Sequence, residues 1–377
     1  MANADELLDL TSAETHKPHW EALTTDLLPL LAACRWHERN ASRILRTRAL
    51  GGRPFWLPGQ RCSISREPLG RVAIIATWNY PVQLLGIQML QALLAGNTLV
   101  VKPSEHAPRT QQRLIEIFIQ AGLLPGTLRG YPATREAGPQ MLRDEHPDHV
   151  IFTGSTAVGR QVAAWAAERL IPTTLELSGS DTALVLADAD PALAARSIWN
   201  AVTMNSGQTC MAPRGALVHR SMYAAFLRQL APLAAGARPR QVITDRAAND
   251  AFALVQHALA SSNARSLSGI AEAPRDGSLR PLAIVDCPLD CPLLDGDHFA
   301  PVLAVAPFDS LDDALAIHAR IPQHLATAVF TRSRFSLPPL HSSIVTLNDC
   351  VIPTGHPALA IIGRGQSGWG ATSGARW

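Results

Sequence analysis

The sequence predicts an α/β protein with an open, mostly parallel sheet of Rossmann type, followed by a second α/β unit. Short apolar runs alternate with segments of helical periodicity, and glycines follow several of the helical segments. The chain has 377 residues, more than one hydrophobic core normally holds, so two domains are expected. Hydrophobic residues make up 47% of the chain, which is enough apolar material for two cores.

The first elements precede the sheet. Residues 20–49 have the rhythm of an amphipathic helix and end at the breaker Gly51-Gly52. The next stretch, residues 52–70, is rich in Gly and Pro, and its RCSIS core (61–65) alternates like an exposed strand. This stretch predicts an edge hairpin or an arm.

From residue 71 the pattern is that of repeated strand and helix units. Strands are predicted at 71–77, 98–102 and 149–153, and helices at 82–95, at 108–121 and directly after GSTAVG (154–159). Strands that alternate with helices of this length pair in parallel through right-handed crossovers. The repeated units therefore predict the Rossmann type of sheet.

A second unit begins within TTLELSGSDTALVLADAD (173–190). Asp190 and Pro191 suit the N-cap and first position of a helix that leads the chain to Cys210. Further elements are predicted as helices at 221–234, 246–262 and 311–320, and as strands at 281–286, 302–306 and 326–331.

Charge and composition exclude several classes of partner. The chain holds 33 Lys+Arg against 31 Asp+Glu, a formal net charge of +2, which does not favour a nucleic acid or a membrane surface. The start of the chain lacks a basic region followed by an apolar run, and no window reaches the roughly 18 apolar residues of a membrane helix. We therefore expect a soluble, cytoplasmic protein.

The cysteines predict neither a disulfide framework nor a metal site. They form no CxxC pair and show no Cys/His spacing of the zinc type, and we interpret CPLDC (287–291) as a chance pair. Thiols in a cytosolic chain stay reduced. One of them, Cys210, follows a predicted helix within GQTC, beside a small flexible residue, which suits an exposed thiol at a turn.

Two polar residues stand at unusual places. Glu176 lies in a run that otherwise predicts a buried strand, where a carboxylate costs several kcal/mol unless it is paired or partly neutral. One interpretation is a salt-bridged core residue. Asn79 follows a predicted strand, where it is either a turn residue or an amide donor to a ligand.

Six segments in this order resemble the NAD(P)-dependent aldehyde dehydrogenase superfamily: TWNYP (77–81), AGNTLVVKPSE (95–105), FTGSTAVG (152–159), LELSG (175–179), NSGQTC (205–210) and FAPV (299–302). The resemblance covers about residues 65–371. It implies a Rossmann-like cofactor domain plus an α/β catalytic domain. Residues 1–178 would hold the N-terminal helices and the NAD-binding domain, with an oligomerisation arm at 53–66, and residues 179–377 the catalytic thiol and the C-terminal segment.

The resemblance also implies the catalytic residues. Cys210 would be the nucleophile, although an unperturbed thiol with a pKa of about 8.5 is only about 3% thiolate at pH 7. Glu176 would be the general base that activates water, a task that a pKa raised by burial suits. Asn79 and the backbone N–H of Cys210 would stabilise the oxyanion.

For the cofactor, the resemblance implies NAD. Lys102 and Glu105 would bind the adenosine ribose, and a carboxylate about 4 Å from a 2′-phosphate would repel it by roughly 1 to 4 kcal/mol, so NADP is less favoured. The helix N-terminus at GSTAVG would receive the pyrophosphate. The remaining residues assigned to the cofactor site are Trp78, Gly154, Ser155, Gly159, Asp297 and Phe299.

Because the sequence departs from the family pattern at several places, alternative functions remain open. The chain is shorter than typical members, and LELSGSD places Ser178 where a glycine lets the backbone approach the nicotinamide. We expect an enzyme that oxidises a small-molecule aldehyde to a carboxylic acid. We also expect a homodimer that forms without the usual exchange of C-terminal arms. The alternatives are a coenzyme A-dependent acylating relative and a shortened, catalytically weak paralogue that binds a nucleotide or a partner.

Overall fold

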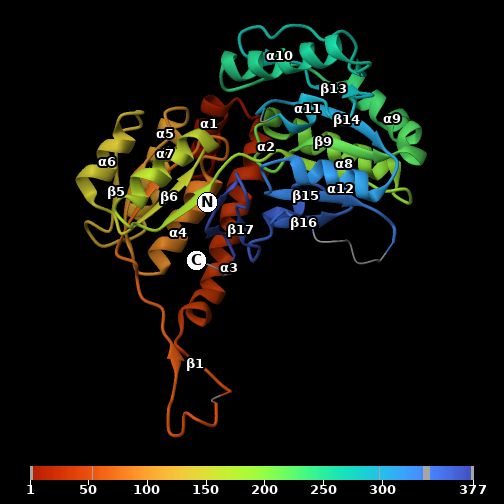
Figure 1. The fold of residues 1–377 in the computed structure, drawn as a ribbon. Helices are drawn as coiled ribbons and strands as arrows, with labels where there is room; N and C mark the ends of the chain where they lie inside the picture. Colours follow the sequence, from red (N-terminus) through yellow and green to blue (C-terminus); the bar gives the residue numbers. More distant parts are fainter. Residues whose placement is uncertain (1–2, 53, 297, 334–339, 375–377) are drawn as a thin grey trace.

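Two sheets covered by helices organise the chain (Figure 1). The computed structural model describes residues 3–52, 54–296, 298–333 and 340–374. The first sheet has six strands in the order β18 (Gly368–Trp369), β7 (Thr173–Glu176), β6 (His149–Thr153), β3 (Arg71–Ile75), β4 (Thr98–Lys102) and β5 (Leu128–Gly130). All of its pairs are parallel except β18 with β7.

The second sheet has seven strands in the order β11 (Arg265–Ser266), β13 (Leu282–Val285), β14 (Val302–Phe308), β9 (Pro213–His219), β8 (Asp181–Val185), β15 (Ala326–Phe330) and β16 (Ile344–Leu347). Only the β11–β13 pair is antiparallel. Residues 177–180 carry the chain from the first sheet to the second, and β18 returns it to the first. The described segments thus form a doubly covered α/β protein, as the sequence predicted.

The helices follow the sheets in chain order. The N-terminal group is α1 (Ala4–Thr15), α2 (His19–Ala22), the π-helical turn η1 (Leu23–Leu27) and α3 (Leu28–Leu45). Around the first sheet lie α4 (Gln83–Leu94), α5 (Pro108–Gln120), α6 (Ala137–Glu145) and α7 (Thr156–Ala167). Around the second lie α8 (Pro191–Thr203), α9 (Arg220–Ala235), α10 (Asp245–Ser261), α11 (Pro292–Asp295) and α12 (Leu311–Arg320). The remaining short elements are the 3-10 turns η2 (Met204–Gly207) and η3 (Ile352–Gly355) and the strands β10 (Arg240–Gln241), β12 (Ser278–Leu279), β17 (Ile361–Ile362) and β19 (Ala371–Thr372).

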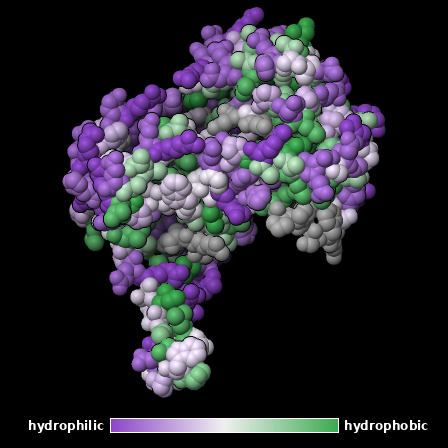
Figure 2. Space-filling view, in the orientation of Figure 1, coloured by the Kyte–Doolittle hydropathy of each residue, from purple (hydrophilic) through white to green (hydrophobic). Residues whose placement is uncertain are grey.

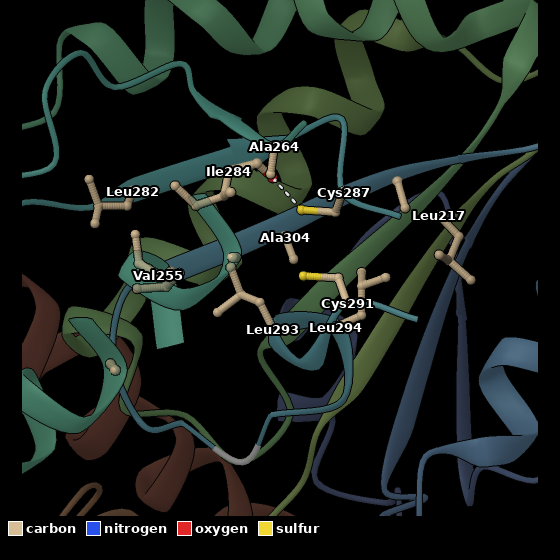
Figure 3. Packing of buried hydrophobic residues seen from close by; sticks show 14 of the residues in the cluster. Leu217, Val255, Ala264, Leu282, Ile284, Cys287, Cys291, Leu293, Leu294 and Ala304 are labelled. Atoms are coloured by element: carbon tan, nitrogen blue, oxygen red, sulfur yellow. Dashed lines mark hydrogen bonds between the residues drawn. The ribbon is translucent and has the colours of Figure 1, made fainter. Parts of the chain in front are cut away.

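Both faces of each sheet are buried, which explains why their strands are continuous apolar runs rather than alternating ones. In β3, Val72 and Ile74 pack in a cluster with α3, α4 and α5, whereas Ala73 packs on the opposite face. The seven-stranded sheet is likewise covered on both faces. One of its clusters includes Cys287 and Cys291 (Figure 3), both of them buried free thiols.

A two-stranded arm extends away from the rest of the molecule (Figure 1). Its strands β1 (Arg48–Ala49) and β2 (Ser63–Ile64) pair antiparallel, close to the predicted hairpin. The loop between these strands exposes Phe55 (90%) and Trp56 (66%) to solvent. In Figure 2 the end of the arm is largely white to pale green, the colours of weakly polar and apolar residues. Exposed aromatic side chains of this kind usually mark a contact surface.

The structure corrects several element assignments. The helix predicted over 20–49 is divided by η1 into α2 and α3, and α1 was not predicted. The central strand β9 was also missed, because its buried Arg214 interrupts the apolar run that would have indicated a strand. By contrast, the predicted N-cap is confirmed, since the Asp190 side chain accepts bonds from the backbone N–H groups of Ala192 and Leu193.

None of the helices in the described part of the chain combines the length and the apolar composition of a membrane span. Within the same residues, no group of three or more His, Cys, Asp and Glu side chains is arranged to hold a metal ion.

Candidate active site

A cavity of about 390 Å³ lies at the ends of β3, β6 and β7, where the chain passes from one sheet to the other. The loops that follow these strands line it, together with the loop that precedes β9. The carboxyl ends of parallel strands are the usual ligand site of such sheets. Three predicted catalytic residues, Asn79, Glu176 and Cys210, line this one cavity although they lie far apart in the sequence.

The loop that carries Cys210 has an unusual backbone. Asn205, Ser206 and Gly207 have φ values of 49°, 55° and 76°, in the left-handed region. A Cβ atom on Gly207 would lie 2.3 Å from the carbonyl carbon of Ala300, so only glycine fits there. Cys210 follows at a turn, as predicted, but its side chain is half-buried rather than exposed.

A buried arginine that the sequence interpretation missed fixes this loop. Arg214 is 0% exposed, and its guanidinium donates to the carbonyl oxygens of Gly207 (2.8 Å) and Thr209 (2.9 Å). A guanidinium presents several donors in a rigid plane, so two bonds to successive parts of a loop hold its shape. The signal available in the sequence was a charged residue inside an otherwise apolar segment, PRGALVH.

Asn79 joins the end of β3 to the same loop. It is 4% exposed, its Nδ2 donates to the carbonyl of Gln208 at 3.0 Å, and its Oδ1 accepts from Thr77 at 3.1 Å. In return, the Nδ2 of Asn205 donates to the backbone carbonyl of Asn79 at 2.8 Å. An amide nitrogen has two hydrogens, so Nδ2 keeps one donor for a ligand in the cavity.

Glu176 is the last residue of β7 and is 8% exposed. Burial raises the pKa of its carboxyl to about 7, although hydrogen bonds from Thr153 (3.2 Å) and Gln88 (3.3 Å) to Oε2 favour the charged form. Thr372 donates to the other oxygen. No described arginine or lysine forms an ion pair with it, which argues against the alternative of a salt-bridged core residue.

The thiol itself is held in its neutral form. Burial and the nearby negative charges of Glu176 and Asp181 raise the pKa of Cys210 to about 12, while Arg214 acts in the opposite direction. Asp181 is 3% exposed and accepts from the backbone N–H of Ala326 at 2.8 Å. Burial raises the pKa of Asp181 to about 8. Cys210 therefore needs a proton acceptor during the reaction rather than a resident thiolate.

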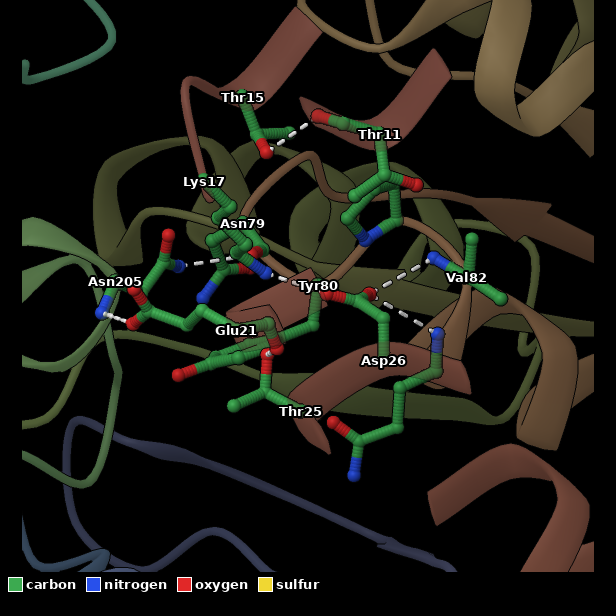
Figure 4. Close-up of polar contacts among 12 residues, drawn as sticks. Thr11, Thr15, Lys17, Glu21, Thr25, Asp26, Asn79, Tyr80, Val82 and Asn205 are labelled. Atoms are coloured by element: carbon green, nitrogen blue, oxygen red, sulfur yellow. Dashed lines mark hydrogen bonds and ion pairs between the residues drawn. The ribbon is translucent and has the colours of Figure 1, made fainter. Parts of the chain in front are cut away.

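A buried polar network connects the N-terminal helices to the catalytic loop (Figure 4). Lys17 and Asp26 form an ion pair at 2.5 Å with both side chains buried, and Asp26 also accepts from the backbone N–H of Val82 at 3.1 Å. Lys17 lies over the ring of Tyr80, 4.0 Å from its centroid, and the Tyr80 hydroxyl bonds to Thr209. No pattern in the sequence indicates this network.

Glu21 adds a second connection from the same helices. Its carboxylate accepts from the backbone N–H of Asn205, and Arg240 lies 3.5 Å from it. Because Asn205 starts the left-handed part of the loop, the N-terminal helices help to set the backbone that presents Cys210.

The predicted ribose-binding pair is formed in the structure but lies outside the cavity lining. Lys102 is 5% exposed, and its Nζ lies 2.8 Å from Oε2 of Glu105. Burial opposes ionisation of Glu105, but the hydrogen bond and the charge of Lys102 lower its pKa to about 2. Arg135 approaches the other carboxylate oxygen at 3.5 Å.

Only some of the other predicted cofactor residues line the cavity. Trp78, Gly154, Ser155 and Phe299 line the cavity, and the rings of Trp78 and Phe299 meet edge to face at 5.8 Å between centroids. Gly159 lies beside the cavity, where a Cβ atom would come within 2.3 Å of the Leu177 side chain. Asp297, predicted beside Phe299, lies outside the described residues.

The chain is similar to known proteins over its whole length. The family model described as "Aldehyde dehydrogenase family" matches residues 1–377. The 4,4'-diapolycopene aldehyde oxidase of Methylomonas sp is 31% identical over 382 residues, which cover 99% of this chain and 72% of that protein. The "Aldehyde dehydrogenase, dimeric NADP-preferring" of Mus musculus is 33% identical over 83% of this chain and 70% of its own length.

Solved structures give the same result. The Mycobacterium tuberculosis aldehyde dehydrogenase complexed with NAD+ is 27% identical and superposes with a TM-score of 0.89, covering 100% of this chain and 79% of that one.

Proposed function

The chain belongs to the aldehyde dehydrogenase family, whose members oxidise aldehydes to acids with NAD or NADP, and we propose that it does so through Cys210, Asn79 and Glu176. The observation that carries this proposal is that one cavity is lined by a thiol, an amide donor and a carboxylate with a raised pKa. Each of these groups suits one step of aldehyde oxidation through a covalent intermediate.

The first step forms a thiohemiacetal. The Cys210 sulfur attacks the aldehyde carbon, and Glu176, whose pKa of about 7 matches neutral pH, takes up the thiol proton directly or through water. The negative charge then develops on the former carbonyl oxygen. The free hydrogen of Asn79 Nδ2 and the backbone N–H of Cys210 stabilise that charge. Both are held in place, since Arg214 bonds to the loop that carries Cys210 and Asn79 bonds to the same loop from the end of β3.

The second step hydrolyses the thioester. Bound NAD would supply the hydride acceptor, and loss of the hydride from the thiohemiacetal would leave a thioester on Cys210. Glu176 first releases to solvent the proton that it took from the thiol. Its carboxylate then accepts a proton from the attacking water and returns that proton to the Cys210 sulfur as the carboxylic acid leaves. Gln88, Thr153 and Thr372 hold the Glu176 carboxylate in place for this step.

The residues present fit a dinucleotide. The N-terminus of α7 adjoins the cavity at Gly154 and Ser155, and helix N-termini bind phosphate groups through free N–H groups and the helix dipole. Lys102 and Glu105 form a donor and acceptor pair suited to ribose hydroxyls. Glu105 is ionised, so it would repel a 2′-phosphate, and NAD is therefore the proposed cofactor although the mouse relative is named NADP-preferring.

The same features argue against the alternatives. In a coenzyme A-dependent enzyme the thioester must survive until the acyl acceptor arrives, whereas Glu176 lies in the same cavity as Cys210 and is suited to activate water. A catalytically weak paralogue would not need the loop contacts of Arg214 and Asn79.

We also propose two domains that divide at residue 178 and a homodimer. The division is supported by the passage of the chain between sheets at residues 177–180. The exposed aromatic side chains of the arm, Phe55 and Trp56, support an association in which a second copy covers them. Analytical ultracentrifugation of the protein and of a Phe55→Ser, Trp56→Ser variant tests the dimer.

The decisive experiment measures NADH formation at 340 nm with NAD and a panel of aliphatic and aromatic aldehydes. We expect NADH and the matching carboxylic acid, identified by mass spectrometry with and without coenzyme A. A Cys210→Ser variant that binds NAD but forms no NADH is the matched control. Absence of NADH from every aldehyde, together with tight NAD binding in a titration, would favour the weak paralogue.

A further inference from the structure

The wall of the cavity beyond the catalytic residues is uncharged. Among the described residues that line the cavity, Glu176 is the only carboxylate, and none is an arginine, a lysine or a histidine. The other titratable groups there are the Cys210 thiol and the Tyr80 phenol. Leu84, Met211, Leu325 and Ile361 supply apolar surface from four separate segments of the chain. The occupant of this space therefore meets hydrocarbon and neutral polar groups.

Two basic residues close to the cavity, Lys17 and Arg214, are already paired. Lys17 lies behind Tyr80 and forms the buried ion pair with Asp26. Arg214 lies beneath the catalytic loop and donates to the carbonyls of Gly207 and Thr209. A carboxylate or sulfonate on the substrate would consequently be buried without a cationic partner, which strongly disfavours binding.

The cavity also disfavours the binding of a cationic substrate. Aromatic faces bind quaternary ammonium groups, but two of the aromatic rings that line the cavity already face a cation. Lys17 lies 4.0 Å from the centroid of the Tyr80 ring, and Arg214 lies 5.6 Å from that of the Phe299 ring. The carboxylate of Glu176 is engaged by Gln88, Thr153 and Thr372. A fixed positive charge in the cavity would also oppose the uptake of a proton by Glu176.

The neutral polar groups of the wall are partly used inside the protein. On η1, the hydroxyl of Thr24 donates to the Trp20 carbonyl at 2.9 Å and that of Thr25 to the Glu21 carbonyl at 2.8 Å. These hydroxyl hydrogens are not available to a ligand. Gln83, at the start of α4, is the neutral amide on this side of the cavity.

From this lining we infer that the enzyme selects uncharged, largely apolar aldehydes and rejects aldehydes of similar length that carry a fixed negative or positive charge. The inference rests on the proposed function, since it concerns the same cavity. Its physical basis is that apolar surface gains free energy on entering such a space, whereas an unpaired charge loses its hydration.

The test compares three aldehydes of matched length at saturating NAD: nonanal, 9-oxononanoate and an aldehyde with a terminal trimethylammonium group. We expect kcat/KM for nonanal to exceed that for each charged aldehyde by about a hundredfold or more. Equal values for nonanal and either charged aldehyde would overturn the inference, while the NADH formed would still support the proposed function.

A binding measurement separates the two proposals further. Nonanamide, which has no aldehyde, should raise the Tm of the NAD-loaded protein, and the monoamide of nonanedioic acid should not at the same concentration. If no aldehyde is oxidised but nonanamide alone raises the Tm, the proposed function fails and the selectivity stands. A Tm rise of the same size with both amides contradicts the selectivity.

A variant tests the cause of the selectivity. Gln83→Arg introduces a cation on the wall and should raise kcat/KM for 9-oxononanoate by about tenfold. Gln83→Met is the matched control, because it has similar length without charge and should give no such gain. If Gln83→Arg keeps the near-ultraviolet circular dichroism spectrum and NAD affinity of the wild type but gives no gain, the lack of a cation is not what excludes anions.

Discussion

The side-chain amide of Asn79 lies 3.0 Å from the carbonyl oxygen of Gln208, so the end of β3 is joined directly to the loop that carries Cys210. This contact brings together residues from the two halves of the sequence. It fixes one hydrogen of Nδ2 on the protein and directs the other to the cavity, where the oxyanion of the reaction would form.

Replacing Asn79 with alanine should lower kcat by about a hundredfold to a thousandfold with little change in KM, because one oxyanion donor is lost. Steady-state kinetics with nonanal measure this effect. Asn97→Ala is the matched control, since Asn97 is a buried asparagine that bonds to Gly70 and Ala92 away from the cavity. It should reduce stability but keep kcat, and a fall in kcat of less than tenfold for Asn79→Ala would contradict the oxyanion role.

Replacing Glu176 with glutamine should retard thioester hydrolysis. At alkaline pH, where other bases accept the thiol proton, stopped-flow measurements should show a burst of NADH close to one equivalent per active site, followed by a slow steady state. Since the carboxylate is the active base and burial raises its pKa to about 7, wild-type hydrolysis should accelerate as pH rises through about 7 and then level off. A variant whose steady-state rate matches the wild type would exclude Glu176 as the base.

Replacing Arg214 with methionine should lower the free energy of unfolding by about 3 to 5 kcal/mol, because it leaves the carbonyls of Gly207 and Thr209 without their donor. The looser loop should also reduce kcat. Urea unfolding and steady-state kinetics measure the two effects. Arg246→Ala serves as the control, since the Arg246 side chain is 89% exposed, and it should change stability by less than about 0.5 kcal/mol.

Replacing Asp181 with asparagine should stabilise the protein more at pH 8 than at pH 5. Burial raises the pKa of Asp181 to about 8, whereas an unfolded aspartate titrates near about 3.9. Between these values the unfolded state is ionised while the folded state keeps its proton, so wild-type stability falls as pH rises across this window. The difference in free energy of unfolding between variant and wild type should grow by on the order of 3 kcal/mol.

Urea unfolding at pH 5 and pH 8 tests the Asp181 prediction. Asp250→Asn is the comparison, because the Asp250 side chain is 71% exposed. A difference that is the same at both pH values would show that Asp181 is ionised in the folded protein.

Replacing Glu105 with glutamine should raise kcat/KM for NADP by about tenfold, since the repulsion of a 2′-phosphate is removed and Lys102 becomes available to it. Kinetics with both cofactors give the ratio. Glu116→Gln, on the exposed side of α5, is the control and should leave the ratio unchanged. An unchanged ratio for Glu105→Gln would show that Glu105 does not set the cofactor preference.

Much of the fold could be predicted because its strands are short apolar runs bounded by helices. The predicted strand at 98–102 agrees with β4, and the predicted helix at 311–320 agrees with α12. Two of the misses share one cause. β9 contains a buried arginine, and η1 interrupts a helical pattern. In both segments the structure depends on tertiary contacts and differs from what the local pattern predicts.

The sequence by itself determined the family and many of the strands and helices, and it predicted the thiol, the carboxylate and the amide, because these depend on local periodicity and on short motifs. Only the tertiary structure decided how the three groups are held and what surrounds them. Burial raises the pKa of Glu176 and Cys210, Arg214 fixes the loop, and Lys17 and Asp26 neutralise each other behind Tyr80. Those effects arise from distances and desolvation between segments remote in sequence, which no local pattern records.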